Sequence, residues 1–181
     1  RAAVGVVEEK WSVIAPLIAN GLDDTNNYTV ASNAAWSLSE LLANAREVGA
    51  DVIMPAHVDG FYARLANLLT IEPDFSMLRM RENAAICVGR LLAFDPNVTR
   101  RVNVPPFFGA LCSALATVAD EPSKVVAVRG LVQLCSPNLG LLANDVGPFL
   151  DLIGGLPQDI PEDLRAELTR LETALKQGAQ A

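Results

Sequence analysis

Two asparagines and a tryptophan stand out among the residues whose chemistry could hold a ligand. Asn33 and Asn83 occupy equivalent places in two similar stretches, SNAAWSLSELLANA (32–45) and ENAAICVGRLLAFD (82–95). One asparagine amide can both donate and accept, so it can hydrogen-bond the backbone of an extended peptide. Trp36 adds a flat apolar platform for a partner side chain or an arginine stem. This combination predicts recognition of a protein segment.

The spacing of these residues places them on one face of a helix. On a helix through 27–47, steps of 3, 4, 4 and 3 residues form a continuous stripe that is polar except for its tryptophan: Asn33, Trp36, Glu40, Asn44 and Glu47. The opposite stripe is apolar and should pack on neighbouring helices. In the second stretch the equivalent stripe is Arg79, Asn83, Ile86 and Arg90, with Glu82 beside it. We expect the ligand to contact Trp36, Asn33, Asn83, Glu40, Ile86 and Glu82.

Each of these residues also has a purely structural interpretation. Trp36 could pack across the boundary between two structural repeats, because a tryptophan is usually buried and its indole needs one partner. Asn33 and Asn83 could form a ladder of amide hydrogen bonds inside the protein. The sequence alone leaves both interpretations open.

Little in the sequence supports an enzyme. His57 is the single histidine, and no second histidine or cysteine stands at the spacing of metal ligands or of a catalytic triad. We expect His57 to lie on the surface. Cys87, Cys112 and Cys135 are isolated in apolar contexts, which is typical of reduced core thiols of an intracellular protein. We therefore expect no enzymatic activity, cofactor or metal.

Charge and hydropathy narrow the choice of partner. The formal net charge is −7, which is the wrong sign for binding phosphate backbones and favours basic partners, although solubility alone can account for it. The hydrophobic runs are too short to cross a bilayer and no signal peptide opens the chain. We expect neither direct nucleic-acid binding nor membrane insertion. Because Arg1 is not a methionine, we expect the chain to be a fragment.

The elements that carry these residues are predicted to be paired helices. Glycine, proline and asparagine clusters separate segments of ordinary helix length, and apolar residues reach 51% with few aromatics, which favours an all-α fold. Similar stretches recur along the sequence at a spacing that varies between about 40 and 50 residues. This recurrence predicts one α-solenoid over 1–181, with about four HEAT repeats of antiparallel helix pairs in a right-handed superhelix. Outer and inner helices are expected to alternate as 10–22 with 27–47, 55–71 with 76–94, 105–119 with 122–135, and 139–153 with 160–177.

These motifs, in register, also resemble a known family. The residues that carry this resemblance are Ser32–Trp36 with Glu40, Glu82–Ala85 with Gly89–Leu91, Arg129–Gly130 and Asp163–Arg165. From about residue 10 to 177 the chain resembles the C-terminal HEAT repeats of the transportin branch of the importin-β family. The resemblance implies a shuttling nuclear import receptor, found in cytoplasm and nucleus. Its concave inner helices would bind cargo with basic proline-tyrosine nuclear localisation signals.

The resemblance carries over residue by residue. Trp36 matches the family's apolar platform, and Asn83 matches an asparagine that lines the cargo path. Asn33 also matches a family asparagine, whereas Ser32 departs from a second asparagine that is common there. The resemblance also implies nucleoporin partners, and contacts to the Ran GTPase mainly through upstream regions. The alternative interpretation is a HEAT-repeat scaffold subunit of a different assembly, because one fold serves many functions.

Overall fold

The computed structural model describes residues 2–44, 56–137, 139–142 and 144–178, with side chains from Lys10 onward. Every regular element in these ranges is a helix, which confirms the all-α prediction. The longer helices are α1 (Ala2–Asp23), α2 (Tyr28–Ala43), α3 (Val58–Thr70), α4 (Leu78–Phe94), α6 (Phe108–Thr117), α7 (Glu121–Cys135), α8 (Val146–Gly154) and α9 (Glu162–Gly178). The described residues also include a short helix, α5 (Val98–Arg101), and 3-10 turns at Phe75–Met77 and Leu139–Leu142.

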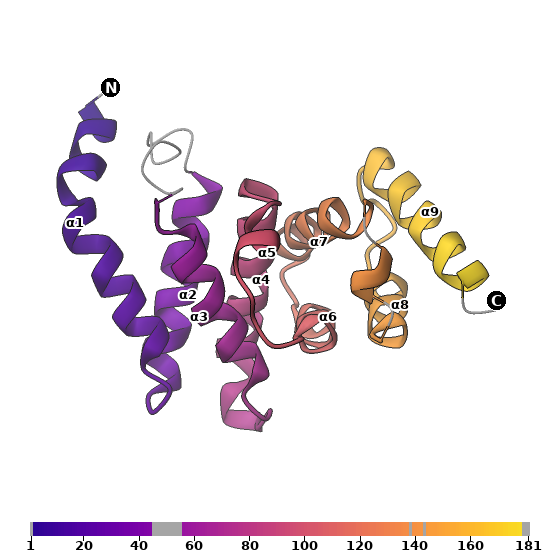
Figure 1. Ribbon diagram of the computed structural model, residues 1–181, viewed down its shortest axis with the longest axis horizontal. Helices are drawn as coiled ribbons and strands as arrows, with labels where there is room; N and C mark the ends of the chain where they lie inside the picture. The colour runs from indigo at the N-terminus through magenta and orange to yellow at the C-terminus, as the bar shows by residue number, and fades with distance from the viewer. Residues whose placement is uncertain (1, 45–55, 138, 143, 179–181) are drawn as a thin grey trace.

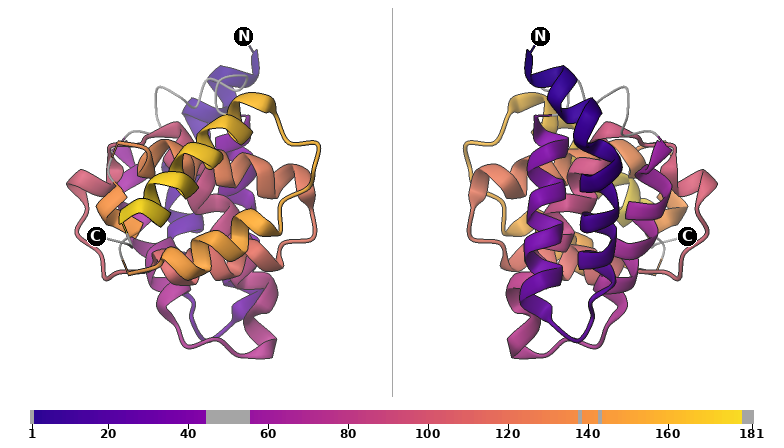
Figure 2. Two further views of the ribbon diagram at one scale, coloured as in Figure 1. Left: turned by 90° about the vertical axis from the view of Figure 1, so that its right-hand side faces the viewer. Right: turned by 90° about the vertical axis from the view of Figure 1, so that its left-hand side faces the viewer.

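The helices pack in two rows that run along the length of the molecule. We call α1, α3, α6 and α8 the outer row, and α2, α4, α7 and α9 the inner row, because each helix contacts the next member of its row. The two termini lie at opposite ends (Figure 1). Viewed from the N-terminal end, α1 and α2 stand side by side as an antiparallel pair (Figure 2). The inner-row helices therefore follow one another along the length of the molecule.

Local sequence signals explain where several helices begin. The Asn27 side chain accepts a hydrogen bond from the backbone N–H of Val30 at 3.3 Å and so caps α2. Asp120 caps α7 in the same way, because its side chain accepts from the Ser123 N–H at 3.1 Å. Pro122 follows in the first turn of α7, where its missing N–H costs nothing.

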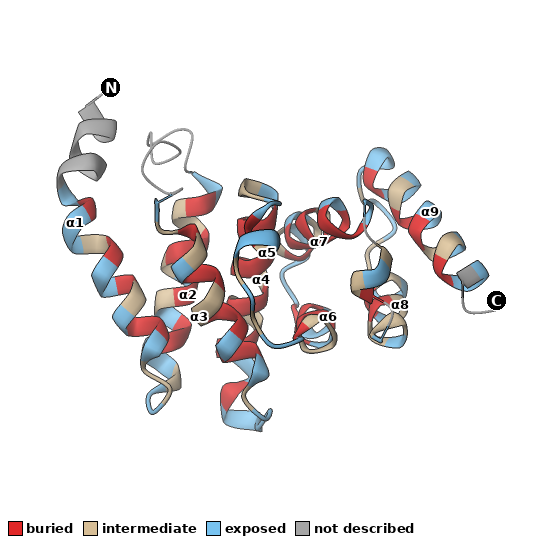
Figure 3. Cartoon of the chain, in the orientation of Figure 1, coloured by how far each residue is buried: buried red, intermediate tan, exposed pale blue. Residues whose placement is uncertain are grey.

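Buried apolar side chains fill the faces where helices meet, and the outward faces are exposed (Figure 3). All three cysteines are buried free thiols, as predicted. Burial raises the pKa of Cys112 and of Cys135 to about 12. These thiols therefore remain protonated and unreactive near neutral pH.

Two glycines allow α4 and α7 to approach at backbone distance. A Cβ atom added to Gly130 would lie 1.9 Å from the carbonyl oxygen of Gly89, and a Cβ on Gly89 would lie 2.4 Å from the Cα of Ala127. Neither site has room for a side chain. The sequence places glycine at both positions, and the crossing of the two helices depends on that choice.

Some predicted boundaries differ from the structure. The segment 139–153 was expected to be one helix, but it contains a 3-10 turn followed by α8, which begins after Asp145. Helix α1 extends further toward the N-terminus than 10–22, and α5 was not predicted. Helix α2 ends at Ala43, with Asn44 at its C-cap donating to the Glu40 carbonyl at 2.8 Å. Glu47 and the expected end of that helix lie outside the described residues.

Candidate functional site

The exposed surface of the inner row includes Trp36 on α2. Its side chain is 56% exposed on α2, whereas Ala31, Ala35 and Leu38 on the opposite side of the same helix are completely buried. The contact between α2 and its neighbours is thus made by small and aliphatic side chains. Trp36 contributes little to that contact and presents its ring to solvent.

One hydrogen-bonded connection joins α2 to α4 beside Trp36. The Asn83 amide nitrogen donates to the Ser32 hydroxyl at 3.0 Å and to the Ser32 carbonyl at 3.3 Å. Asn83 is therefore half-buried and used inside the protein. The structure does not contain the amide ladder between Asn33 and Asn83 that was one of the two interpretations, because Asn83 donates to Ser32 and the Asn33 side chain is exposed.

A second hydrogen-bonded connection between α2 and α4 lies about two helical turns further along both helices. Arg90 donates from Nη1 to the Ser39 hydroxyl at 3.0 Å, to the Ser39 carbonyl at 3.1 Å and to Glu40 Oε1 at 2.8 Å. Its Nη2 donates to the Ser123 hydroxyl on α7 at 3.3 Å. One mostly buried guanidinium, with 13% of its side chain exposed, thus connects three inner-row helices.

The two connections fix the register between α2 and α4. Ser32 and Ser39 are seven residues apart on α2, and their partners Asn83 and Arg90 are seven apart on α4. The two helices therefore run parallel. Trp36 on α2 and Ile86 on α4 fall between the connections and form an apolar strip on this surface.

The remaining predicted residues lie along the same surface. Asn33 is exposed, and within the described residues its side chain has no hydrogen-bond partner. Glu82 is half-buried at the flank of the α4 stripe. Glu40 keeps 45% of its side chain exposed, with one carboxylate oxygen on Arg90. The surface thus offers one unused amide, a partly neutralised carboxylate and an apolar strip.

Sequence reasoning had placed Arg90 in the stripe but overlooked its pairing. Superposing Asn33 on Asn83 also superposes Glu40 on Arg90, so equivalent positions carry opposite charges. In stacked repeats, equivalent positions are neighbours, and this charge pattern was a usable signal. Ser32, where the resemblance would have an asparagine, accepts a hydrogen bond from Asn83 in the structure.

An ion pair extends the surface to α9. Arg129 on α7 makes two hydrogen bonds to the carboxylate of Asp163 in the first turn of α9. The hydrogen bond from Arg129 lowers the pKa of Asp163, and the same contact raises the pKa of Arg129. Glu40 and Asp163 on the inner row thus each face an arginine within the protein.

Other candidate chemistry is weak in the described residues. His57 is half-buried and not simply a surface residue, because its ring lies 5.6 Å from Trp11 and 6.1 Å from Phe61. In the part of the chain that the structure describes, no group of three acidic, histidine or cysteine side chains could hold a metal ion. None of the helices within those ranges has the length and apolar character needed to cross a bilayer.

Comparisons of the chain with protein-family models, with curated proteins and with solved structures found no match. The function of this surface is therefore argued from its own geometry.

Proposed function

We propose that this chain is the C-terminal cargo-binding region of a nuclear import receptor of the importin-β type, built as an α-solenoid of HEAT repeats. In this proposal the four helix pairs are the four repeats, and the inner row is the concave face. Cargo proteins would carry basic proline-tyrosine nuclear localisation signals. Nucleoporins and the Ran GTPase would be further partners, and the protein would shuttle between cytoplasm and nucleus.

The exposure of Trp36 is the observation that carries the proposal. A tryptophan buries more apolar area than other residues when it is packed, so a ring that is 56% exposed is costly unless a partner covers it. Exposed tryptophans surrounded by polar groups are typical of the side chains that dominate binding energy in protein interfaces. Here the surrounding groups, Asn83 and Arg90, are held by internal hydrogen bonds, so the ring is displayed on a rigid support.

The polar groups around the ring suit an extended segment that crosses the inner helices. Asn33 has its amide available for a backbone carbonyl or N–H of the ligand. Ile86 continues the apolar strip onto α4. Glu40 uses one oxygen for Arg90, which leaves the other for a basic ligand side chain, and Glu82 lies nearby on α4.

Internal pairing changes the expected balance of forces. Because Glu40 and Asp163 already face arginines, charge should contribute less than apolar contact to the affinity. The net charge of −7 still favours a faster encounter with a basic segment at low salt. We therefore expect a salt-sensitive association rate and an affinity that depends mainly on Trp36.

The test is a fluorescence-anisotropy titration of a labelled basic proline-tyrosine signal peptide against the chain and its Trp36→Ala variant. Truncating a central interface tryptophan costs about 2 kcal/mol or more, which corresponds to about a 30-fold increase in Kd. Phe75→Ala is the matched control, because this ring is 93% exposed and lies outside the inner-row surface. Equal binding by the Trp36→Ala variant and the unmodified chain would contradict the proposal and favour the scaffold alternative.

A further inference from the structure

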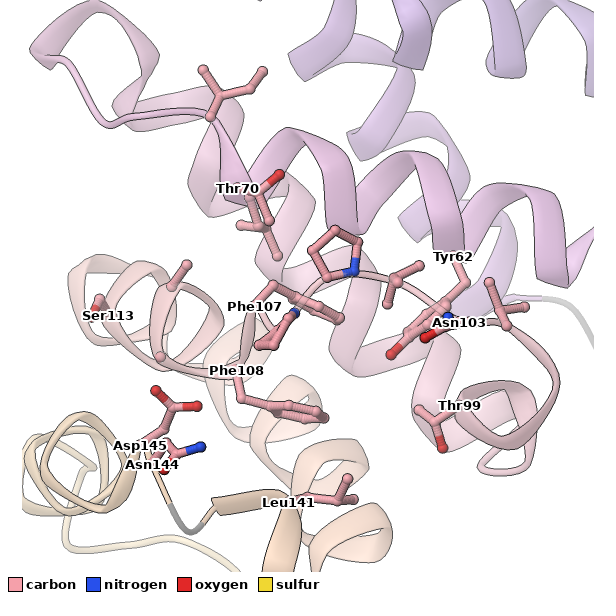
Figure 4. A pocket seen from close by; sticks show the side chains of 18 of the residues that line it. Tyr62, Thr70, Thr99, Asn103, Phe107, Phe108, Ser113, Leu141, Asn144 and Asp145 are labelled. Atoms are coloured by element: carbon pink, nitrogen blue, oxygen red, sulfur yellow. The ribbon is translucent and has the colours of Figure 1, made fainter.

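A cavity of about 980 Å³ lies on the outer-row side of the molecule and shares no residue with the proposed cargo surface (Figure 4). It is lined by α3, α5, the start of α6 and the extended segment 102–107 that connects α5 to α6. Ligand pockets in proteins typically enclose about 300–1,000 Å³. The cavity is therefore large enough for a small organic molecule.

Aromatic rings form one wall of the cavity. The rings of Tyr62 and Phe107 meet edge to face with centroids 5.7 Å apart, and those of Phe107 and Phe108 are stacked at 5.3 Å. Phe107 is only 3% exposed, whereas Phe108 is half-buried and borders the open part of the cavity. A flat apolar group could extend this ring stack.

The Tyr62 hydroxyl in the same wall faces the cavity (Figure 4) and has no partner among the described residues. Tyr62 is 1% exposed, lines the cavity, and its hydroxyl makes no hydrogen bond with any described residue. Figure 4 shows the Tyr62 hydroxyl directed toward the cavity, at the end where Thr99 and Asn103 are also found. Burial raises the pKa of Tyr62, so the phenol stays protonated and acts as a donor at neutral pH. The hydroxyl reaches the cavity and uses no acceptor in the described part of the protein, so it can donate to an acceptor on a ligand.

The residue that follows Thr99 in the chain is a cation without a carboxylate partner among the described residues. Arg100 lines the cavity, is exposed, and makes no ion pair with a described residue. Its neighbour Arg101 is different, because Asp59 and Asp95 each accept a hydrogen bond from it at 2.6 Å. The unpaired charge of Arg100 therefore favours an anionic ligand group.

One acidic residue of the lining lies away from the Tyr62 hydroxyl. Asp145 stands at the opposite side of the view in Figure 4, against Gly109, where an added Cβ would lie 2.5 Å from its Oδ1. The lining also includes Arg81, which donates to the Leu69 carbonyl at 3.0 Å, and the exposed Glu72 on the segment after α3. The carboxylate of Asp145 is therefore separated from the end that presents the Tyr62 hydroxyl.

We propose that this cavity binds a small aromatic anion, a carboxylate or sulfonate. Its acidic group would accept from the Tyr62 hydroxyl and pair with Arg100, and its ring would pack against Phe108. This site is independent of the proposed cargo binding, because the two surfaces share no side chain.

A matched pair of fluorescent probes tests the ligand class. 8-Anilino-1-naphthalenesulfonate carries the anion, and N-phenyl-1-naphthylamine has the same rings without the sulfonate. We expect the sulfonate to bind one-to-one and at least 5-fold more tightly than the neutral probe, with nuclear Overhauser contacts to the Phe108 ring. Equal affinity of the two probes, or many weak sites, would overturn the proposal.

Two substitutions test the site itself. Tyr62→Phe and Arg100→Gln should each weaken sulfonate binding at least 5-fold, whereas Arg79→Gln, an exposed arginine outside the cavity, should leave it unchanged. Tyr62→Phe should not lower the melting temperature, because it removes a hydroxyl that has no partner in the described protein. Unchanged binding in both cavity variants, or binding reduced only as far as a lowered melting temperature explains, would refute the assignment.

Discussion

The two contacts that α4 makes within the inner row are built in different ways. Toward α2, the contact is joined by side-chain hydrogen bonds from Asn83 and Arg90. Toward α7, it is a close backbone approach at Gly89 and Gly130. Side chains can adjust when a partner changes, whereas two backbones that already touch cannot. The first contact should set register and tolerate substitution, and the second should set distance and tolerate none.

The largest expected effect comes from breaking the glycine contact. Gly130→Ala places a methyl group 1.9 Å from the Gly89 carbonyl oxygen, so α7 must move away from α4. We expect the free energy of unfolding to fall by about 3 kcal/mol or more. Thermal denaturation followed by circular dichroism measures this loss.

A matched helical glycine provides the control for that experiment. A Cβ on Gly147 in α8 meets nothing within 4 Å, so Gly147→Ala should be neutral or stabilising by about 0.5 kcal/mol through helix propensity. If both alanine variants unfold at the same temperature, the close approach of α4 and α7 is incorrect.

The next largest effect should come from removing the residue that belongs to both contacts. Arg90→Ala deletes hydrogen bonds to Ser39, Glu40 and Ser123 together with buried aliphatic packing. We expect a loss of about 2 kcal/mol in the free energy of unfolding, because Glu40 can still be hydrated. Chemical denaturation with urea measures it. A loss below that of Ser32→Ala would show that Arg90 is not the main connection.

A smaller effect should follow from removing one hydroxyl of the α2–α4 contact. Ser32→Ala leaves the Asn83 amide with the Ser32 carbonyl alone. We expect a loss of about 1 kcal/mol in the free energy of unfolding, as for one net hydrogen bond. The Ser32→Asn variant introduces the asparagine that the transportin resemblance would place here. This variant should retain stability only if α2 and α4 can accommodate the larger side chain.

The smallest effect should be acid sensitivity at the start of α7. Hydrogen bonds from Ser123 lower the pKa of Asp120 below its usual value of 3.8. Because the pKa of Asp120 is lower in the folded protein than in the unfolded chain, the hydrogen bonds that it accepts from Ser123 stabilise the fold. This stabilisation is fully present above the unfolded-state pKa, and it is lost as pH falls through the folded-state pKa. A pH series of melting curves from neutral to acid should show the loss below about pH 4, and a smaller loss in Asp120→Asn.

Repetition made much of the fold predictable from the sequence. The fifty-residue spacing of Asn33 and Asn83 identified α2 and α4 as equivalent helices, and the structure places them side by side. The exposed position of Trp36 follows from the same helical spacing. The break between Leu142 and Val146 was missed, because the apolar residues on either side fit one continuous helix pattern.

The side-chain partners were harder to predict than the helices. A shift of one residue between neighbouring helices gives Asn83 the partner Ser32 in place of Asn33, and a repeat alignment does not contain that shift. The outer-row cavity was also missed. Pro105 and Pro106 indicated only a helix boundary, whereas the cavity depends on how the extended segment around them lies against Tyr62.

The glycine contact between α4 and α7 has a mechanical consequence. Because Gly89 and Gly130 let the α4 and α7 backbones touch, and because Arg90 also crosses this contact to Ser123, the two helices should move as one rigid unit. The α2–α4 contact extends this unit, because its two attachments seven residues apart resist rotation. The contact between α7 and α9 is much less extensive, so a pulling force applied to the two ends should bend the molecule there first.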